Sequence, residues 1–293
     1  MPYHPAMVTI CIAFKLPPRY DQAARTISRH VARQSPSQFV LGERFAREDG
    51  EIPVAHSTVL QVEIDPADIP AMWDAVQQKV ASHSSLRIDN AVYRHNPYGA
   101  VEAHWDASPE WTALQQDVVD AARPFCRMAD KDPSGVSNEE ILSFWQQNPD
   151  NRDRIEKFTQ DHFAETGPWY SPHATFTWLD TEFEAHPDGL HDSDGVVTKE
   201  GFPDLEPLQA EYPAEAFNGA ELGELCCFRR GGLGTCLDER ADPITLPSRQ
   251  EARAVRAATA GITSPAAAAG EPRPESDSAH RSTIDPERGR SGR

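Results

Sequence analysis

The chain has 293 residues, a formal net charge of −18 and an apolar fraction of 39%. Its length allows one large domain or two small ones, and its low apolar fraction indicates that part of the chain lies outside a packed core. Because non-specific affinity for nucleic acid comes mainly from lysine and arginine on phosphates, so acidic a chain disfavours long RNA or DNA as a partner. A small phosphate ester in a local pocket stays compatible with this charge.

The cysteines and the hydropathy pattern bear on the compartment. The five cysteines are odd in number and lack the spacing of a metal or disulfide framework, which favours free thiols in a reducing environment. No apolar run approaches the roughly 20 residues of a membrane span, and the first residues lack the form of a signal peptide. We therefore expect a cytoplasmic monomer.

Apolar periodicity predicts alternating strands and helices in the first 180 residues. The predicted strands cover 7–16, 39–41, 54–64, 86–93, 100–105 and a segment that begins at His173. The predicted helices cover 21–33, 68–81 with Asp68 as N-cap, 108–122 with Ser108 as N-cap, 138–147 and 152–164. This order predicts an α+β fold.

The second half of the chain shows less pattern. Regular periodicity fades after about residue 205, and from residue 243 the chain is rich in Ala, Pro, Ser, Arg and Glu. Such a composition buries too little apolar surface to offset the entropy of ordering. We expect one domain over 1–205, with an insertion at about 126–151, and a low-complexity, largely disordered tail over 206–293.

One short pattern occurs twice in strand-like contexts. His56-Ser-Thr58-Val and His173-Ala-Thr175-Phe each place a threonine two residues after a histidine. Five of the eleven histidines fit a looser His-x-Ser/Thr pattern, but only these two combine Thr with a following strand-like run. Because side chains at i and i+2 share one face of a strand, each His and its Thr should project together. A structural role for a single strand histidine is the competing interpretation, and two strict copies favour a functional one.

These motifs and their surroundings resemble the 2H phosphoesterase superfamily, which includes 2′-5′ RNA ligase-like proteins and cyclic nucleotide phosphodiesterases. The two His-x-Thr motifs match the family signature, and Tyr170-Ser-Pro-His173 is similar to the aromatic-x-Pro-His entry to its second motif. The resemblance covers about residues 7–180. It implies a bilobal fold, with antiparallel sheets around a central cleft that both motifs line.

The chemistry of the motifs suits hydrolysis of a phosphodiester without a metal or other cofactor. His56 and His173 are candidates for general base and general acid, in an order that the sequence does not set. Thr58 and Thr175 are candidates for binding the phosphate oxygens on which charge develops. The expected substrate is a small nucleotide-derived ester with a cyclic or 2′-5′-linked phosphate. A fold of the same kind that binds a nucleotide without turnover is an alternative.

Four further residues are weaker candidates for contact with the substrate. Tyr98, Trp169 and Tyr170 lie near the motifs in sequence and could stack on a base or ribose, with core packing as the competing interpretation. Arg94 could contact a phosphate.

Two acidic segments suggest a different function, calcium binding in EF-hand-like loops. Asp130, Asp132 and Ser134 match the first ligand positions of such a loop, but the glutamate expected at position 12 falls one residue early. Asp192 and Asp194 belong to a second incomplete copy. A calcium-responsive binding protein is therefore the second alternative.

Overall fold

The computed structural model describes residues 7–96, 99–127, 138–147, 149–161, 166–180 and 204–262. The chain divides into two compact units, Met1–Ala254 and Val255–Arg293. The first unit holds every described strand and is the subject of this section. The second is described only to residue 262, at the end of helix α7 (Arg249–Ile262).

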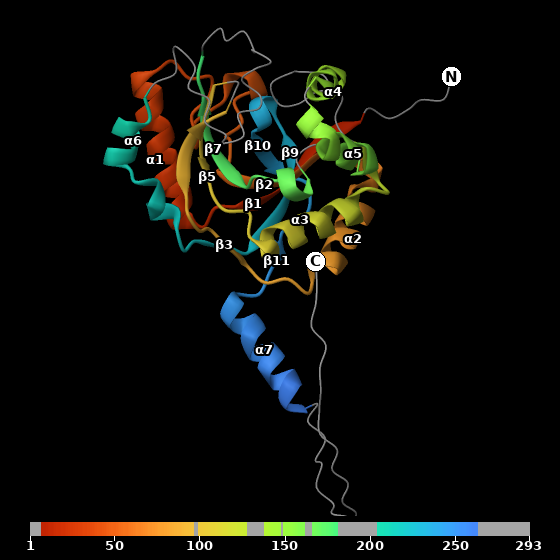
Figure 1. Cartoon of the computed structure of the whole chain (residues 1–293). Helices are drawn as coiled ribbons and strands as arrows, with labels where there is room; N and C mark the ends of the chain where they lie inside the picture. The colour runs from red at the N-terminus through yellow and green to blue at the C-terminus, as the bar shows by residue number, and fades with distance from the viewer. Residues whose placement is uncertain are drawn as a thin grey trace, which may run out of the picture. The chain divides into compact units, whose positions relative to one another are not determined.

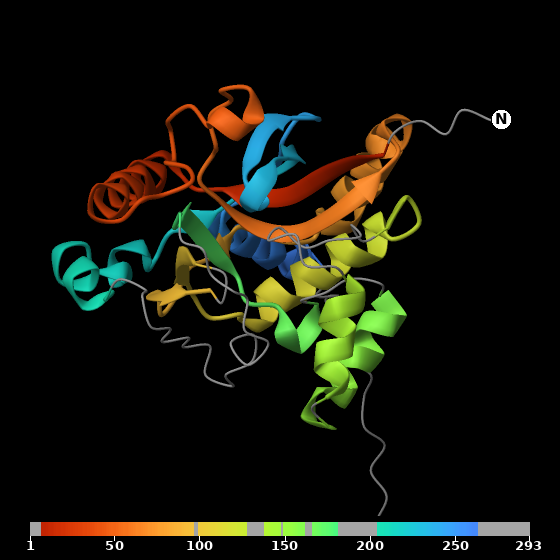
Figure 2. The ribbon, with the colours of Figure 1, turned by 90° about the horizontal axis from the view of Figure 1, so that it is seen from above.

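The largest sheet is antiparallel and is built around the first strand of the chain. Its strands are β1 (Val8–Lys15), β2 (His56–Ile64), β6 (Cys126–Arg127), β9 (Glu224–Arg230), β10 (Cys236–Glu239) and β11 (Ile244–Thr245). They follow the order β10-β9-β1-β2-β6, and β11 pairs with β9. Figure 2 shows β1 and β2 running side by side, with β9 and β10 on the other side of β1. The predicted first strand and the predicted first His-Thr strand are thus confirmed and are direct neighbours.

The second His-Thr strand belongs to a separate three-stranded antiparallel sheet. That sheet has the order β4-β5-β7, with β4 (Val92–His95), β5 (Ala100–His104) and β7 (His173–Trp178). A two-stranded pair consists of β3 (Leu86–Arg87) and β8 (Glu221–Leu222). The single strand predicted over 86–93 is therefore wrong, because its two ends join different sheets. Asn90 between them has a left-handed φ of 57°, which an extended strand does not accommodate.

The predicted helices are present with small shifts at their ends. They are α1 (Pro18–Gln34), α2 (Ile69–Val80), α3 (Pro109–Ala122), α4 (Asn138–Gln146), α5 (Arg152–Asp161) and, beyond the predicted set, α6 (Glu206–Glu211). Short 3₁₀ turns lie at Ala46–Glu48, Pro66–Asp68, Pro149–Asn151, Gly167–Trp169, Ala214–Phe217 and Gly232–Gly234. Asp68 and Ser108 precede α2 and α3 as predicted, but neither side chain makes a capping hydrogen bond.

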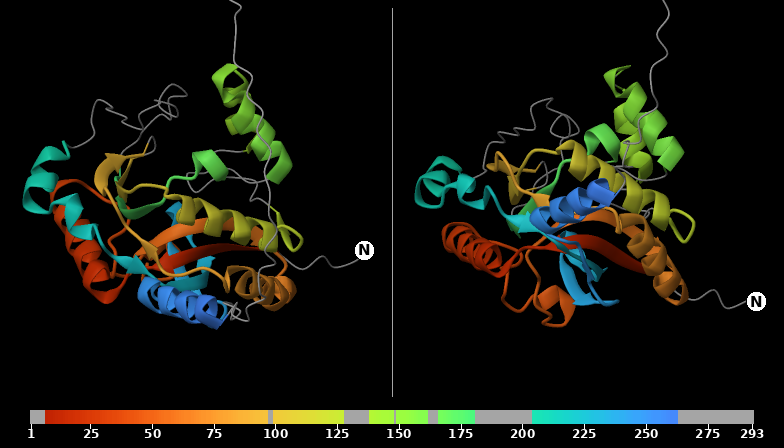
Figure 3. Two further views of the ribbon diagram at one scale, coloured as in Figure 1. Left: turned by 60° about the horizontal axis from the view of Figure 1, so that its bottom comes forward. Right: turned by 90° about the horizontal axis from the view of Figure 1, so that it is seen from below.

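Helices α2 and α3 lie side by side and cover one face of the large sheet (Figure 3). Ile10, Ile12 and Phe14 of β1 belong to the main hydrophobic core, and the Phe14 ring packs edge-on against Trp111 of α3 with 5.7 Å between centroids. Burying these side chains stabilises the fold by about 2 kcal/mol each. This face of β1 and β2 is therefore committed to packing.

The opposite face of β1 carries a second, smaller cluster. Its fully buried members are Cys11, Ala13, Cys226, Phe228 and Cys236. Val54 stands two residues before β2, and its amide donates to the carbonyl of Cys236 over 2.9 Å. This bond connects the edge strand β10 to the start of β2. The cluster is thus enclosed by strands next to the first His-Thr motif.

The predicted boundary at residue 205 is wrong. Strand β9 lies inside the large sheet between β1 and β10, and its Cys226, Cys227 and Phe228 are fully buried. Its partner β1 stands more than 200 residues earlier in the chain, so local periodicity gave no sign of the pairing. Residues 263–293 of the predicted tail lie outside the described part of the chain.

The strand predicted at 39–41 is also wrong. Phe39 and Leu41 are buried in irregular chain, where the Leu41 amide donates to the Ser28 hydroxyl over 2.9 Å. Mixed helix and antiparallel sheet otherwise confirm the predicted α+β class. None of the helices in the described ranges combines the length and the hydropathy of a membrane-spanning segment.

Candidate active site

The two His-Thr strands come from different sheets but lie next to each other (Figures 1 and 2). The Tyr170 hydroxyl, just before β7, donates to the backbone carbonyl of Thr58 in β2 over 3.1 Å. The charge of His173 also contributes to lowering the pKa of His56, so the two imidazoles lie within electrostatic reach of each other. The structure therefore brings the two distant motifs into one region.

The first motif ends at a β-bulge. β1 pairs Ala13 with Thr58 but Ile12 with Leu60, so Val59 is the extra residue. Val59 and Leu60 are consecutive and both buried, as a bulge allows.

The second motif ends at a bulge in the same position. β5 pairs Glu102 with Thr175 but Val101 with Thr177, so Phe176 is the extra residue. Phe176 and Thr177 are again consecutive and fully buried. Each bulge thus falls on the residue directly after the threonine.

The bulges explain how polar and core-forming residues share one strand. A regular strand would place His56 and Thr58 on the same face as Leu60 and Val62, which belong to the main core. The extra residue reverses the alternation, so that the His-Thr end faces away from that core while the remainder faces into it. A bulge next to an active site commonly re-aims side chains in this way.

The two histidines are also anchored alike. Nδ1 of His56 lies 2.8 Å from the carbonyl oxygen of Val54, and Nδ1 of His173 lies 2.8 Å from the carbonyl oxygen of Ser171. A carbonyl only accepts, so Nδ1 carries the proton in both rings. In the neutral rings, Nε2 is then the nitrogen with a lone pair for chemistry.

The first copy lies in an apolar, thiol-lined setting. His56 is only 7% exposed. Burial lowers its pKa from 6.5 to about 4, opposed by backbone hydrogen bonds to Val54 and Gly234 and aided by the charge of His173. The imidazole is therefore neutral at pH 7, and a backbone hydrogen bond joins it to Gly234 in the turn Gly232–Gly234.

Two cysteines complete the surroundings of the first copy. Thr58 Oγ1 lies 3.6 Å from the sulfur of Cys11, and because sulfur is a weak hydrogen-bond partner this contact holds the half-buried hydroxyl only weakly. The ligand atoms of Cys11, His56 and Cys236 lie within 4.8 Å of one another. Burial raises the pKa of Cys236, which keeps this thiol protonated at neutral pH.

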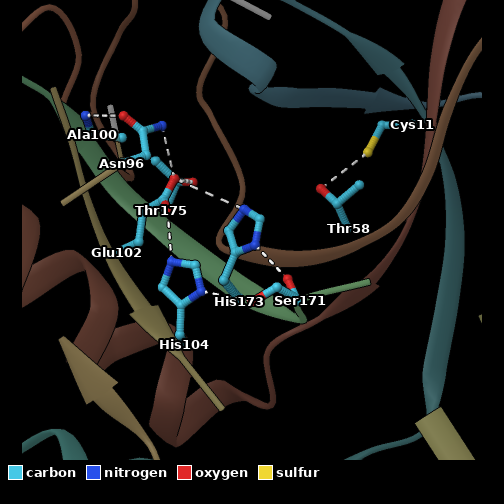
Figure 4. A network of polar contacts seen from close by, with 9 residues as sticks. All are labelled: Cys11, Thr58, Asn96, Ala100, Glu102, His104, Ser171, His173 and Thr175. Carbon is cyan, nitrogen blue, oxygen red and sulfur yellow. Dashed lines mark hydrogen bonds and ion pairs between the residues drawn. The ribbon is translucent and has the colours of Figure 1, made fainter. Parts of the chain in front are cut away.

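The second copy faces a carboxylate and another histidine, as Figure 4 shows. Across the strands, Glu102 stands opposite Thr175, and His104 stands opposite His173. Glu102 accepts hydrogen bonds from His104 Nε2 at 2.8 Å and from Thr175 Oγ1 at 3.0 Å. Nε2 of His173 lies 3.8 Å from the same carboxylate, and the two imidazoles stack with 4.9 Å between centroids.

Glu102 is a buried, ionised group. It is 3% exposed, and Asn96 Nδ2 also donates to it over 3.2 Å. Burial alone would raise its pKa, but the charge of His173 and the hydrogen bonds from His104 and Thr175 hold the pKa at about 2, below the ordinary 4.5. Burial lowers the pKa of His104. A fixed negative charge therefore stands behind the second motif.

The hydroxyls of the two threonines differ in their availability to a phosphate. Thr175 donates its one proton to Glu102, so this proton points away from any bound phosphate. Thr58 is the better placed donor, because within the described part of the chain its hydroxyl has only the weak contact with the sulfur of Cys11.

The other predicted contacts divide between packing and the site. Tyr170 is 6% exposed, its ring packs against Trp111, and its hydroxyl donates to the Thr58 carbonyl of β2. These contacts give Tyr170 a structural role. Arg94 of β4 stands opposite Glu102 of β5, and its charge affects the pKa of His104. Arg94 therefore lies beside the second motif. Trp169 is half-buried at the end of a 3₁₀ turn before β7.

Six predicted site residues fall outside the described ranges. They are Tyr98 and the calcium candidates Asp130, Asp132, Ser134, Asp192 and Asp194.

Sequence reasoning missed Glu102 and His104. The signal was present, because Glu102-Ala-His104 places two polar residues at i and i+2 in a strand of small apolar residues. The alternation that identified the His-Thr pairs predicts that these two also share a face. The cross-strand pairing that adds them to His173 needed the structure.

No family model matches this chain, and a search of the curated proteins finds no match.

Proposed function

We propose that this chain is a phosphodiesterase of the 2H type, which hydrolyses a small cyclic or 2′-5′-linked nucleotide phosphate. The supporting observation is the shared construction of the two His-Thr copies, with an anchored Nδ1 and a bulge after the threonine in each. In this proposal the large sheet and the three-stranded sheet each supply one side of a bilobal cleft, and one phosphate binds between the motifs.

The surroundings suggest an order for the proton transfers. His56 is neutral at pH 7, so its lone pair suits the base that takes a proton from water. His173 faces the ionised Glu102, and that negative charge favours the protonated imidazolium of a general acid. His173 would then donate a proton to the leaving oxygen as the bond from phosphorus to that oxygen breaks.

The remaining groups suit binding of a small anion. The Thr58 hydroxyl can donate to a non-bridging oxygen and stabilise the charge that develops there. Arg94 offers a cation beside the second copy, and Trp169 is the candidate surface for stacking on a base. The acidic chain keeps the expected partner small, as the net charge of −18 predicts.

A second candidate function is nucleotide binding without turnover. The burial of His56 favours it, because only 7% of this residue is exposed to the water that hydrolysis consumes.

The test is hydrolysis of 2′,3′-cyclic AMP and of a 2′-5′-linked diadenylate. We expect turnover by the wild-type chain and a loss of roughly 10²- to 10⁴-fold in His56→Ala and in His173→Ala. His83→Ala is the matched control. Nε2 of His83 lies 2.8 Å from a carboxylate oxygen of Asp117, and this pair belongs to neither motif. The variant should therefore keep the wild-type rate. Saturable binding without turnover would support the second candidate. Undiminished turnover in both motif variants would exclude the assignment.

A further inference from the structure

The second copy contains an arrangement that goes beyond the proposed hydrolysis, which uses Glu102 and His173 but gives no role to His104. The ligand atoms of Glu102, His104 and His173 all lie within 4.8 Å of one another. We infer that these three residues form a binding site for one zinc ion. The inference rests on how the three groups are aimed and held, and it does not depend on phosphodiesterase activity.

Both imidazoles turn Nε2 toward the same carboxylate. Nε2 of His104 lies 2.8 Å from Oε2 of Glu102, and Nε2 of His173 lies 3.8 Å from its Oε1. The close-up in Figure 4 shows the two rings converging on Glu102 from β5 and β7. A metal-binding site needs this convergence of donor atoms on one point.

Each imidazole is also held from behind by the same residue. Nδ1 of His173 donates to the Ser171 carbonyl over 2.8 Å, and Nδ1 of His104 lies 3.0 Å from the Ser171 hydroxyl. Metal-binding histidines nearly always have such a partner on the second ring nitrogen, which fixes the ring and its tautomer. When zinc binds Nε2 of His104, the ring proton moves to Nδ1, where the Ser171 hydroxyl can accept it.

The carboxylate is equally well oriented. Asn96 and Thr175 both donate to Oε1 of Glu102, which fixes the plane of the group. The side chains of His104 and His173 are 15% and 27% exposed, so the cluster is partly open to solvent. Three protein ligands and a water molecule are a common zinc coordination, and a partly exposed cluster suits it.

The donor types favour a transition metal. Two imidazoles and one carboxylate suit zinc, as they also suit iron(II), whereas magnesium and calcium prefer oxygen ligands throughout. Zinc is the ion proposed here because it binds without redox chemistry. The ionised Glu102 supplies the negative charge that a cation requires. The charge of Arg94 reaches His104 and works against a cation, which should limit the affinity.

The first copy holds a rival ligand set, Cys11, His56 and Cys236. All three residues are buried, and the two sulfurs are fully enclosed by strands. Thiolate ligation also has a distinct spectrum, because cobalt bound by thiolates shows an intense charge-transfer band in the near ultraviolet. The two sites can therefore be told apart.

The experiment titrates zinc into the chelator-treated full chain in competition with a chromogenic chelator. We expect one zinc ion per chain and a weakening of about 100-fold or more in His104→Ala, because removing a ligand should cost more than removing the partner of a ligand. Ser171→Ala changes an exposed residue that contacts a ligand, and it should weaken binding by roughly 10- to 100-fold. Cys11→Ser/Cys236→Ser is the matched control and should bind as the wild-type chain does. Circular dichroism checks that each variant folds.

Three results would overturn the inference. They are no binding at micromolar zinc, undiminished affinity in His104→Ala and Ser171→Ala, or a cobalt complex with a thiolate band that only the cysteine variant loses. Because the readout is metal binding, an inactive but zinc-binding chain would refute the proposed function alone. In an active chain, zinc on Nε2 of His173 should stop the hydrolysis.

Discussion

The two His-Thr copies share a local backbone but differ in what their partner strands bring to them. The first faces Ala13 and Lys15 of β1, and the second faces Glu102 and His104 of β5. The first histidine is therefore kept neutral by burial, whereas the second stands against a fixed negative charge. One repeated motif can thus take two unlike chemical roles through its cross-strand neighbours.

As the pH falls below 7, the first loss of folding stability should come from His56. The pKa of His56 falls from 6.5 in the unfolded chain to about 4 in the folded one, so the unfolded chain takes up the proton first as the pH drops. The folded chain should lose about 3 kcal/mol of stability as the pH falls through this window, and the loss begins near pH 6.5, where the unfolded chain takes up its proton. Urea denaturation across the window should show this loss in the wild-type chain and not in His56→Gln. Equal losses in both chains would contradict the neutral, buried His56.

The two threonines should differ in their effect on catalysis. Thr58→Val removes the hydroxyl proposed to bind the phosphate and should lower kcat roughly 100-fold. Thr175→Val should lower kcat far less, because the Thr175 hydroxyl already donates its proton to Glu102. Steady-state kinetics on 2′,3′-cyclic AMP check the contrast. The reverse order would show that Thr175 leaves Glu102 to bind substrate.

The buried carboxylate should matter for stability as well as for chemistry. Glu102→Gln keeps the shape but places an amide among three donors, and it should lower the free energy of unfolding by about 2 kcal/mol at pH 7. Glu43→Gln is the control, because Glu43 pairs with Arg29 at the exposed surface and should cost well under 1 kcal/mol. Denaturation with a chelator present excludes effects of bound metal. A cost no larger than the control's would mean that the network is only loosely formed.

The hydrogen bond that joins the two copies should have the smallest effect. Tyr170→Phe removes the donor to Thr58 and should cost about 1 kcal/mol of stability. Tyr93→Phe loses a similar bond, to the Tyr212 carbonyl at 2.7 Å, and should cost about as much. Of the two variants, only Tyr170→Phe should also lower kcat/KM, because Tyr170 connects β7 to β2 by its hydrogen bond and Tyr93 does not. Equal activities in the two variants would show that this tie does not position the motifs.

Local patterns predicted the features that depend on nearby residues. The strand around His56, the helices at 69–80 and 109–122 and the shared face of each His and Thr follow from hydrophobic periodicity and alternation. Two consecutive buried residues, Val59 and Leu60, were the visible trace of a bulge, but alternation alone does not place it.

Features that depend on distant pairing escaped prediction. Strand β9 pairs with β1 across most of the chain, and β5 brings Glu102 beside a motif some 70 residues later. Burial of a carboxylate is costly unless partners surround it, and no sequence window contains all of those partners. The asymmetry between the two copies was for this reason absent from the sequence prediction.

The most direct test of the central claim is a double-variant cycle on the two histidines. The measurement is kcat/KM for 2′,3′-cyclic AMP in the wild-type chain, His56→Ala, His173→Ala and the double variant. If both imidazoles act on one phosphate, kcat/KM of the double variant should be little lower than that of the less active single variant. Losses that multiply, or a single variant with the full wild-type rate, would contradict a shared site.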